Sequence, residues 1–361
     1  MKSLTVGSAM IDTIAIIASE RIERMSMLNA NASFLLLQEG SKTEAIDIST
    51  HCGGGAVNTA VGLARLGFDA ATLVKLGQDQ RAETILQRLM AEGVSPRWAI
   101  RDGRAPTGAA VLVSSHDRNA AIFTFRGANT LLEARDLKDD AFAVDLVHVA
   151  SLSNASADQF PAIVAKAKAQ GAWVSVNPGP RQLAARAAAF EQCLGKVDIL
   201  SINRSEAEVL VPTLVARFGE GGPAAEGDDL PRLAARGFVG GGFHMSMRRL
   251  MGAVLSLGPR ILLVTDGGGG AYAATGDEIV YAAPVLVEVA GTAGAGDAFV
   301  STFAGGTAMG WPLDKALKAA ALNAASVVGH VDTQSGLLRA AELDARLADQ
   351  GERIAIRRWP I

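Results

Sequence analysis

Short β-branched runs alternate with alanine-rich segments of helical periodicity along most of the 361 residues. ATLVKLG precedes AETILQRLMAEG, DLVHVAS precedes DQFPAIVAKAKAQG, and DILSINRSEAEVL joins a run of each kind. Strands separated by helix-length connections pair in parallel, because a parallel neighbour requires a crossover connection. The pattern therefore predicts a single α/β domain over residues 1–361, with a doubly wound sheet between two helical layers (a three-layer α/β/α fold).

Three regions depart from this alternation. Residues 14–50 and 105–127 read as hairpin strands with polar turns, and together they predict a small β lid. The alternative is an irregular extension of the edge of the main sheet. Residues 212–242 are rich in Gly, Pro and Ala and carry an acidic cluster, which predicts a loop-rich insertion around a short helix.

Composition and charge exclude several classes of protein. The 34 basic and 37 acidic residues give a net charge of −3 without a long run of one sign, so no nucleic-acid-binding surface is predicted. No apolar run approaches the roughly 20 residues that cross a bilayer, so no membrane span is predicted. Cys52 and Cys193 are too few for a disulfide framework, which favours a reducing compartment and a cytoplasmic location.

The strongest chemical signal is a glycine-rich turn before an alanine-rich helix, GTAGAGDAFVSTFAGG at residues 291–306. The amides of Gly294, Ala295 and Gly296 are expected at the helix N-terminus, where unpaired N–H groups and the helix dipole favour an anion. Asp297 then falls in the first helical turn. Spacing alone leaves two interpretations open, a charge that complements the dipole or a general base beside bound phosphate.

The context favours the general base. Phosphoryl transfer requires an anion cradle and a carboxylate that accepts the proton of the attacking hydroxyl, and both lie within four residues here. The run ILLVTDGGGGAY at 261–272 adds a buried-type strand that ends at Thr265 and is followed by glycines. A nucleotide often lies against such strand ends, although the glycines also fit a plain turn.

A second glycine cluster, Gly53 to Gly55 in HCGGGAVNTAVGLARLG, precedes a helix predicted to begin near Ala56. Its spacing is not G-x-G-x-x-G, which argues against a dinucleotide site. The glycines would instead let a sugar approach the backbone. Asn58 on this helix and Asp12, expected at the end of the first strand, are candidates for binding sugar hydroxyls. Capping or turn roles stay open for both residues.

The run SINRSEAEVL places Asn203 and Glu206 three residues apart at a strand-to-helix junction. Their oxygens suit Mg²⁺ bound through water. The simpler interpretation is a helix start, with Asn203 as cap and Glu206 near the positive end of the helix.

Four segments in order carry a resemblance to a known family: GSAMID, CGGGAVNTAVGLARLG, SINRSE, and VTDGGGGAY with GTAGAGDAF. On these segments the chain resembles the ribokinase-like (PfkB-type) carbohydrate kinases. The resemblance implies ATP- and Mg²⁺-dependent transfer of a γ-phosphoryl group to a hydroxyl of a sugar, a nucleoside or a related polyol. It also implies a lid that closes over the substrate and a homodimer contact through that lid.

Site residues follow from the resemblance position by position. Asp297 matches the catalytic base, and Gly294, Ala295 and Gly296 match the anion hole. The nucleotide side is matched by Thr265, Gly267, Gly270 and Asn323, with Asn203 and the magnesium candidate Glu206 nearby. The acceptor side is matched by Asp12, Gly54, Gly55, Asn58 and Asn129.

One departure concerns potassium. The family usually has an aspartate before the glycine turn that helps to coordinate a monovalent cation. Gly291 stands at that position and has no side-chain oxygen, which puts potassium activation in doubt.

Three functions follow from these patterns. A sugar kinase is favoured, since NPG at 177–179 and the RGAN segment look more like the sugar-directed branches. A nucleoside kinase is the close alternative, with Phe123, Phe125 and Trp98 as a shelf for the base. A non-catalytic metabolite-binding regulator is the third, and the retained Asp297 argues against it.

Overall fold

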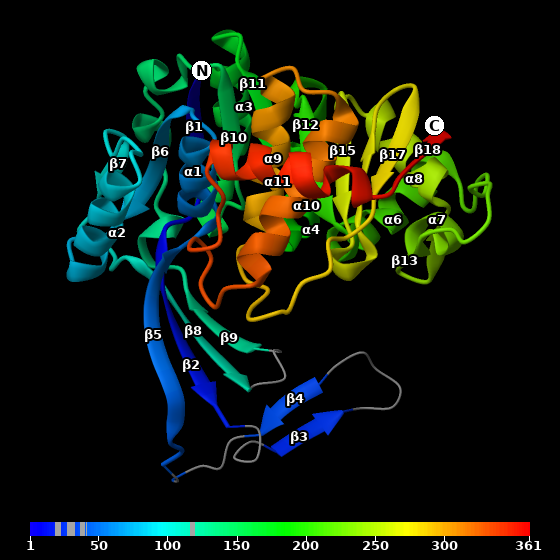
Figure 1. Ribbon diagram of the computed structural model, residues 1–361. Helices are drawn as coiled ribbons and strands as arrows, with labels where there is room; N and C mark the ends of the chain where they lie inside the picture. The colour runs from blue at the N-terminus through cyan, green and yellow to red at the C-terminus, as the bar shows by residue number, and fades with distance from the viewer. Residues whose placement is uncertain (19–22, 27–32, 37–39, 41, 116–119) are drawn as a thin grey trace.

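Ten strands form the main sheet of the computed structural model, which describes residues 1–18, 23–26, 33–36, 40, 42–115 and 120–361 (Figure 1). Seven neighbouring strands, from β15 to β7, run parallel to one another. The remaining three strands, β16, β17 and β18, are joined to one edge by antiparallel pairing. The central strands are buried along nearly their whole length, as expected for a parallel sheet covered on both faces. In spatial order the strands are β18 (Ile356–Pro360), β17 (Glu278–Ala282), β16 (Ala271–Ala274), β15 (Ile261–Thr265), β12 (Ile199–Asn203), β11 (Trp173–Val176), β10 (Leu146–Val149), β1 (Lys2–Val6), β6 (Asp69–Leu76) and β7 (Ala99–Arg101).

Helices cover both faces of this sheet and create two separate hydrophobic cores. One face carries α1 (Gly55–Arg65), α2 (Gln80–Ala91), α9 (Ala295–Ala308), α10 (Leu313–Val328) and α11 (Ala340–Gln350). The other carries α3 (Phe160–Ala169), α4 (Pro180–Ala185), α5 (Ala187–Glu191), α6 (Arg204–Phe218), α7 (Arg232–Arg236) and α8 (Met247–Ser256). The predicted three-layer α/β/α architecture is confirmed.

Short 3-10 segments complete the connections. They are η2 (Gly127–Thr130), η3 (Ala134–Asp136), η4 (Asp139–Phe142), η5 (Asn154–Gln159), η6 (Leu194–Lys196), η7 (Gly267–Gly269) and η8 (Gly351–Arg353). Over the described ranges, no helix combines the length and apolar character needed to cross a membrane.

The direction of winding reverses between β1 and β10. From β1 the chain continues outward to β6 and β7, whereas from β10 it continues the other way to β11, β12 and β15. Doubly wound sheets bind ligands outside the carboxyl ends of the strands at such a switch point. Here those ends are followed by Gly7 and Ala150, which lie against each other.

A smaller four-stranded sheet projects from the main body (Figure 1). Its order is β5 (Ala45–Gly53), β2 (Met10–Ile17), β8 (Gly108–Ser115) and β9 (Ala120–Phe125), and a hairpin of β3 (Glu23–Ser26) and β4 (Ser33–Leu36) lies beyond it. These strands come from the two regions predicted as a lid, of which 19–22, 27–32, 37–39, 41 and 116–119 lie outside the described residues. Asp12 was expected at the end of the first strand, but β1 ends at Val6 and Asp12 lies within β2.

The region predicted as a loop-rich insertion, 212–242, is partly helical. Its first seven residues continue α6, which has Pro212 inside it, and α7 forms the predicted short helix. Its last residues enter a hairpin of β13 (Phe238–Gly240) and β14 (Phe243–Met245). Backbone carbonyls of Glu226 and Asp228 accept hydrogen bonds from Trp359 and Arg357 at 3.0 and 2.8 Å, which fasten the insertion to the edge strand β18.

Candidate active site

Two helix N-termini meet at the switch point. Asn58 of α1 contacts Asp297 of α9, and one turn further along Gly62 lies against Ser301, so the two helices run side by side in the same direction. An added Cβ on Gly62 would lie 2.5 Å from the Ser301 hydroxyl, so the small residue permits this close packing. The positive ends of both helix dipoles therefore lie close together.

Asp297 is half-buried in the first turn of α9. Burial raises the pKa of this carboxyl to about 6, and a hydrogen bond from Asn58 Nδ2 to Asp297 Oδ2 at 2.8 Å acts in the opposite direction. At neutral pH this carboxyl group is mostly ionised, and its pKa lies close to the pH range in which a general base is most effective. Gly55 lies beside it, at the start of α1.

A second carboxylate, Asp12, comes from the small sheet. It packs on Gly53, where an added Cβ would lie 1.9 Å from Asp12 Oδ2. Burial raises the pKa of Asp12 to about 6, and the charge of Asp297 contributes to the same rise. The two carboxylates therefore lie close enough for their charges to interact, Asp12 on the small sheet and Asp297 on the main body.

The glycine turn before α9 has the predicted geometry. Gly294 is the N-cap, with φ of 79° in the left-handed region that favours glycine. An added Cβ would lie 2.6 Å from Thr333 Cβ, so this turn is packed against the loop that follows α10. The first amides of α9 have no intrahelical acceptor and are available to an anion.

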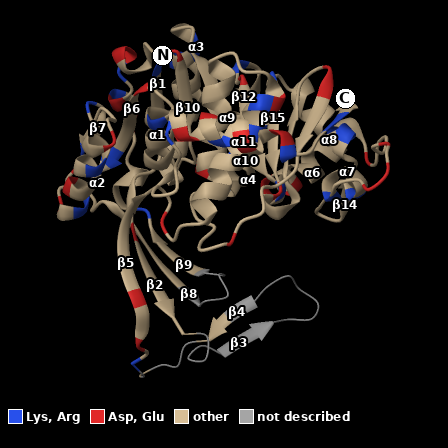
Figure 2. Ribbon diagram, in the orientation of Figure 1, with Lys and Arg blue, Asp and Glu red and all other residues tan. Residues whose placement is uncertain are grey.

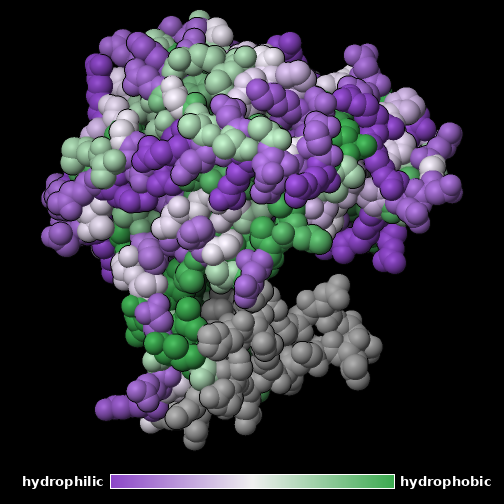
Figure 3. Space-filling model, in the orientation of Figure 1, coloured by the Kyte–Doolittle hydropathy of each residue, from purple (hydrophilic) through white to green (hydrophobic). Residues whose placement is uncertain are grey.

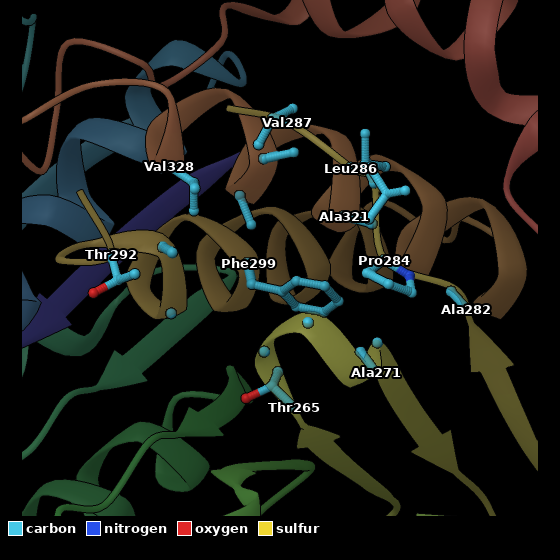
Figure 4. A pocket seen from close by; sticks show the side chains of 18 of the residues that line it. Thr265, Ala271, Ala282, Pro284, Leu286, Val287, Thr292, Phe299, Ala321 and Val328 are labelled. Carbon is cyan, nitrogen blue, oxygen red and sulfur yellow. The ribbon is translucent and has the colours of Figure 1, made fainter. Parts of the chain in front are cut away.

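A largely apolar cavity of about 480 Å³ lies on the other side of this turn, a size typical of small-molecule sites (Figure 4). Thr265, Phe299 and Pro284 project into it from three different segments (Figure 4). It ends at Ala295 and Gly296, beside Asp297. The remaining lining residues are Asn203, Gly267, Gly268, Gly270, Ala271, Ala282, Ala283, Val285, Leu286, Val287, Val289, Thr292, Ala321, Ala324, Ala325 and Val328.

Of the residues predicted for the nucleotide side, Thr265, Gly267, Gly270 and Asn203 line this cavity, whereas Asn323 does not. Asn323 is fully buried, its Nδ2 donates to Thr302 Oγ1 at 2.7 Å, and its Oδ1 accepts from the backbone of Leu338 at 2.8 Å. It joins α9, α10 and the following loop from inside, while its helical neighbours line the cavity.

Two residues predicted to bind the acceptor have other partners. The amide of Asn129 exchanges two hydrogen bonds of 2.9 Å with the backbone of Ala9, so both of its polar groups are occupied. Asn58 is buried and directs its Nδ2 to Asp297. Asn58 thus contacts the candidate base. Gly55 also lies beside Asp297, whereas Gly54 packs against Ser8 and Ala9.

Asn203 and Glu206 form a reciprocal capping box. Asn203 Oδ1 accepts from the Glu206 amide at 2.9 Å, and Glu206 Oε2 accepts from the Asn203 amide at 2.8 Å. This is the helix-start interpretation of that pair. Burial raises the pKa of Glu206. Across the described part of the chain, no group of three or more His, Cys, Asp or Glu side chains is arranged to hold a metal ion.

The proposed shelf for a nucleoside base is wrong in its geometry. Phe123 and Phe125 pair with Val111 and Ala109 of β8, which place them on the face of the small sheet opposite Asp12. Both are more than half exposed. Trp98 packs on the core of the main body, next to the Arg97 guanidinium.

The sequence reasoning missed Thr333 and Gln334, both of which touch Asn58. Thr333 Oγ1 and Gln334 Nε2 each donate to Asn58 Oδ1 at 3.0 Å. They lie 275 and 276 residues away from Asn58 along the chain, in a loop whose two separate glycines and single acidic residue, Asp332, form no recognisable motif. Only the folded structure brings them to the site.

The architecture is that of the ribokinase fold, with the N-terminus of α9 beside a carboxylate. A solved structure described as a putative ribokinase II from E. coli in complex with ATP and Mg²⁺ superimposes with a TM-score of 0.74. It is 18% identical and the match covers 96% of this chain and 99% of that one. This likeness confirms the fold.

The family model for pfkB family carbohydrate kinases matches residues 5–221 and 243–340, and so omits most of the insertion. This chain belongs to that family, whose members are phosphotransferases with an alcohol acceptor. It is 27% identical to a deoxyribokinase of Salmonella typhi over 89% of this chain and 94% of the relative. It is also 27% identical to a ribokinase of Staphylococcus aureus over 70% and 73% of the two chains.

Proposed function

We propose that this chain is a cytoplasmic, ATP- and Mg²⁺-dependent kinase that phosphorylates a hydroxyl of a sugar or sugar-like molecule. One observation carries the proposal: Asp297 directly follows Gly296, which lines the cavity, and its charge reaches Asp12 of the small sheet. The cavity suits a nucleotide, and the polar groups around Asp12 suit a polyhydroxylated acceptor. A carboxylate between the two can act on the hydroxyl that receives the phosphoryl group.

The chemistry divides among the chain's own residues. Asp297 accepts the proton of the acceptor hydroxyl as its oxygen bonds to the γ-phosphorus, and the bond from that phosphorus to the β–γ bridging oxygen breaks to release ADP. The amides of Gly294, Ala295 and Gly296 donate to the oxygens of the transferring group and offset its charge. Asp12, Gly54 and Gly55 hold the other hydroxyls of the acceptor. The phosphoryl group is transferred directly from ATP to the acceptor, without a phosphoenzyme intermediate.

Mg²⁺ would neutralise charge on the nucleotide phosphates. The described residues offer no cluster of protein ligands, which fits an ion held mainly by phosphates and water. Glu206 is the candidate to orient such a water, since its capping partner Asn203 lines the cavity.

A sugar acceptor is favoured over a nucleoside. Two of the aromatic residues predicted to form a base shelf, Phe123 and Phe125, lie on the outer face of the small sheet, and the third, Trp98, packs on the core of the main body. Both relatives described above are named as kinases of a pentose. The small sheet, which carries Asp12, would close over the acceptor as a lid and exclude water as a competing acceptor.

The test is ADP release from ATP and Mg²⁺ with pentoses, deoxypentoses, hexoses, sugar acids and nucleosides as acceptors. Turnover confined to one sugar group would support the proposal and define the substrate class. Turnover with nucleosides alone would replace it with the nucleoside kinase. If no acceptor raises ADP release while ATP still binds, the sugar proposal fails for this panel.

Turnover is expected to be independent of potassium. Gly291 has no side-chain oxygen, and the position of an added Cβ is already 3.0 Å from the His330 carbonyl and 3.2 Å from the Val331 carbonyl. Rates in potassium and sodium chloride of equal ionic strength should agree within about twofold, less than 0.6 kcal/mol in the barrier. A large activation by potassium would show that backbone oxygens alone suffice for the ion.

The outer face of the small sheet supports a homodimer through this sheet. Ile48, Val111, Phe123 and Phe125 lie on it and are 65%, 43%, 61% and 51% exposed. Figure 2 shows few charged residues here, and Figure 3 shows hydrophobic side chains over much of its visible part. Such patches usually mark an interface.

The substitution Phe123→Asp should therefore convert a dimer to a monomer in sedimentation equilibrium. Val239→Asp, an equally exposed apolar position on β13, is the matched control and should leave the mass unchanged. A wild-type chain that sediments as a monomer would contradict the dimer.

A further inference from the structure

The loop that follows α10, residues 329–339, contacts two parts of the proposed active site at once. Thr333 packs on the Gly294 turn, and Thr333 and Gln334 donate to Asn58 Oδ1 at 3.0 Å each. Thr333, Gln334 and Asn58 are 6%, 2% and 3% exposed. Water therefore does not compete for these hydrogen bonds, and no water can replace a donor that is removed.

The chemistry of the side chains sets the direction of this hydrogen-bond chain. Arg88 Nε donates to Gln334 Oε1 at 2.9 Å, and a guanidinium has no acceptor. The Gln334 amide nitrogen must then face Asn58, where it donates to Oδ1, and its second hydrogen goes to the Cys52 carbonyl at 3.1 Å. With both lone pairs of Asn58 Oδ1 occupied, Asn58 Nδ2 is left to donate to Asp297.

We propose that Thr333 and Gln334 are positioning residues that fix the amide of Asn58, so that it donates to Asp297 and keeps this base ionised and aimed at the acceptor hydroxyl. The inference rests on the proposed role of Asp297. Arg88 and its partner Glu92, at 2.9 Å, anchor the far end of the chain on α2. The candidate base is thereby connected to α2, none of whose residues lines the cavity.

Without the two donors, the amide of Asn58 would lose its preferred orientation. If it turned over, its oxygen would face the Asp297 carboxylate, and repulsion would replace attraction. Burial already raises the pKa of Asp297, and the hydrogen bond from Asn58 is what opposes that rise. Losing it moves the pKa of Asp297 further up, so less of the base is ionised at a given pH.

Other titratable groups surround Asp297, and the test leaves all of them unchanged. The nearest carboxylate is Asp12, whose pKa responds to the charge of Asp297. α10 carries its charged residues in its first turns, away from the end that borders the site. The groups on the surrounding elements are Asp12 on β2, His51 on β5, Arg65 on α1, His148 on β10, and His330 and Asp332 in the loop.

The test compares wild type with the double variant Thr333→Val, Gln334→Met, which keeps the shape of both side chains and removes both donors. The titration of Asp297 is read directly from carbon-13-labelled aspartate, with its signal assigned by its loss in Asp297→Asn. The pH profile of kcat/KM is measured in parallel. We expect both the carboxyl pKa and the acid limb to rise by about one pH unit, equivalent to about 1.4 kcal/mol.

Thr333→Ser and Thr302→Val are the controls. The first keeps the hydroxyl donor and should leave the titration near that of wild type. The second removes a buried hydroxyl of α9 that bonds only to Ala298 and Asn323, so it should lower stability without moving the acid limb. If the double variant does not fold, Thr333→Val alone gives the same comparison with a smaller shift.

The outcomes separate the two proposals. A folded double variant whose Asp297 titrates as in wild type would overturn the positioning role. A carboxyl pKa that rises while the acid limb stays in place would show that the chain of donors acts on Asp297 but that Asp297 is not the base. Parallel movement of both supports the inference.

Discussion

Asp297→Asn should lower turnover by on the order of 10²- to 10⁴-fold, the usual contribution of a general base. An amide of the same shape can accept the hydrogen bond from Asn58 with its oxygen, but it cannot take a proton from the acceptor. Folding and ATP binding should be retained, because the cavity proposed for the nucleotide ends at Gly296 and does not include Asp297. Steady-state ADP release and ATP titration by calorimetry measure the two quantities.

Asp277→Asn is the matched control, since Asp277 is exposed on the turn before β17, far from both substrate sites. Its turnover should equal that of wild type. Equal turnover in the Asp297 variant would remove this carboxylate from the mechanism and leave it as a charge that complements the α9 dipole.

Gly294→Ala should reduce kcat by on the order of 10²- to 10³-fold, comparable to the loss of one oxyanion-hole donor. The new Cβ would lie 2.6 Å from Thr333 Cβ, so the turn must move, and its amides would no longer point at the transferring phosphoryl group. The left-handed conformation adds about 1–2 kcal/mol of strain for a residue with a side chain. Crowding adds about 1–3 kcal/mol more.

Gly310→Ala is the control that introduces the same backbone strain at a position away from the proposed active site. Gly310 has φ of 80°, nearly that of Gly294, but an added Cβ there meets nothing within 4 Å. It should cost about 1–2 kcal/mol in the free energy of unfolding and leave kcat unchanged. If both variants lost the same stability and neither lost activity, the Gly294 turn would not be the anion site.

The layered fold was predictable from the chain because its signals are local. Each strand-and-helix pair is encoded by one continuous segment, such as residues 69–91 for β6 and α2, and the glycine turn before Asp297 lies within four residues. The same holds for the Asn203–Glu206 junction, where the capping interpretation needed no distant partner. Local patterns could not show that Asp12 belongs to a different sheet from the first strand, since β1 and β2 are only three residues apart.

Side-chain direction was the part that the sequence could not supply. Asn58, Asn129 and Asn323 all carry an amide that suits a ligand, and in each case the folded chain provides a partner instead. Those partners are the Asp297 side chain, the Ala9 backbone and Thr302, between 21 and 239 residues away. An amide is equally suited to sugar, backbone and carboxylate, so its residue type does not decide among them.

The parallel packing of α1 on α9 has a consequence for the way activity develops during folding. The hydrogen bond between Asn58 and Asp297 spans 239 residues, and those from Thr333 and Gln334 to Asn58 span about 275. Contacts of such high sequence separation form late, because the entropy of closing the loop must be overcome first. A nascent chain therefore completes the hydrogen bonds around Asp297 only when the loop after α10 has docked.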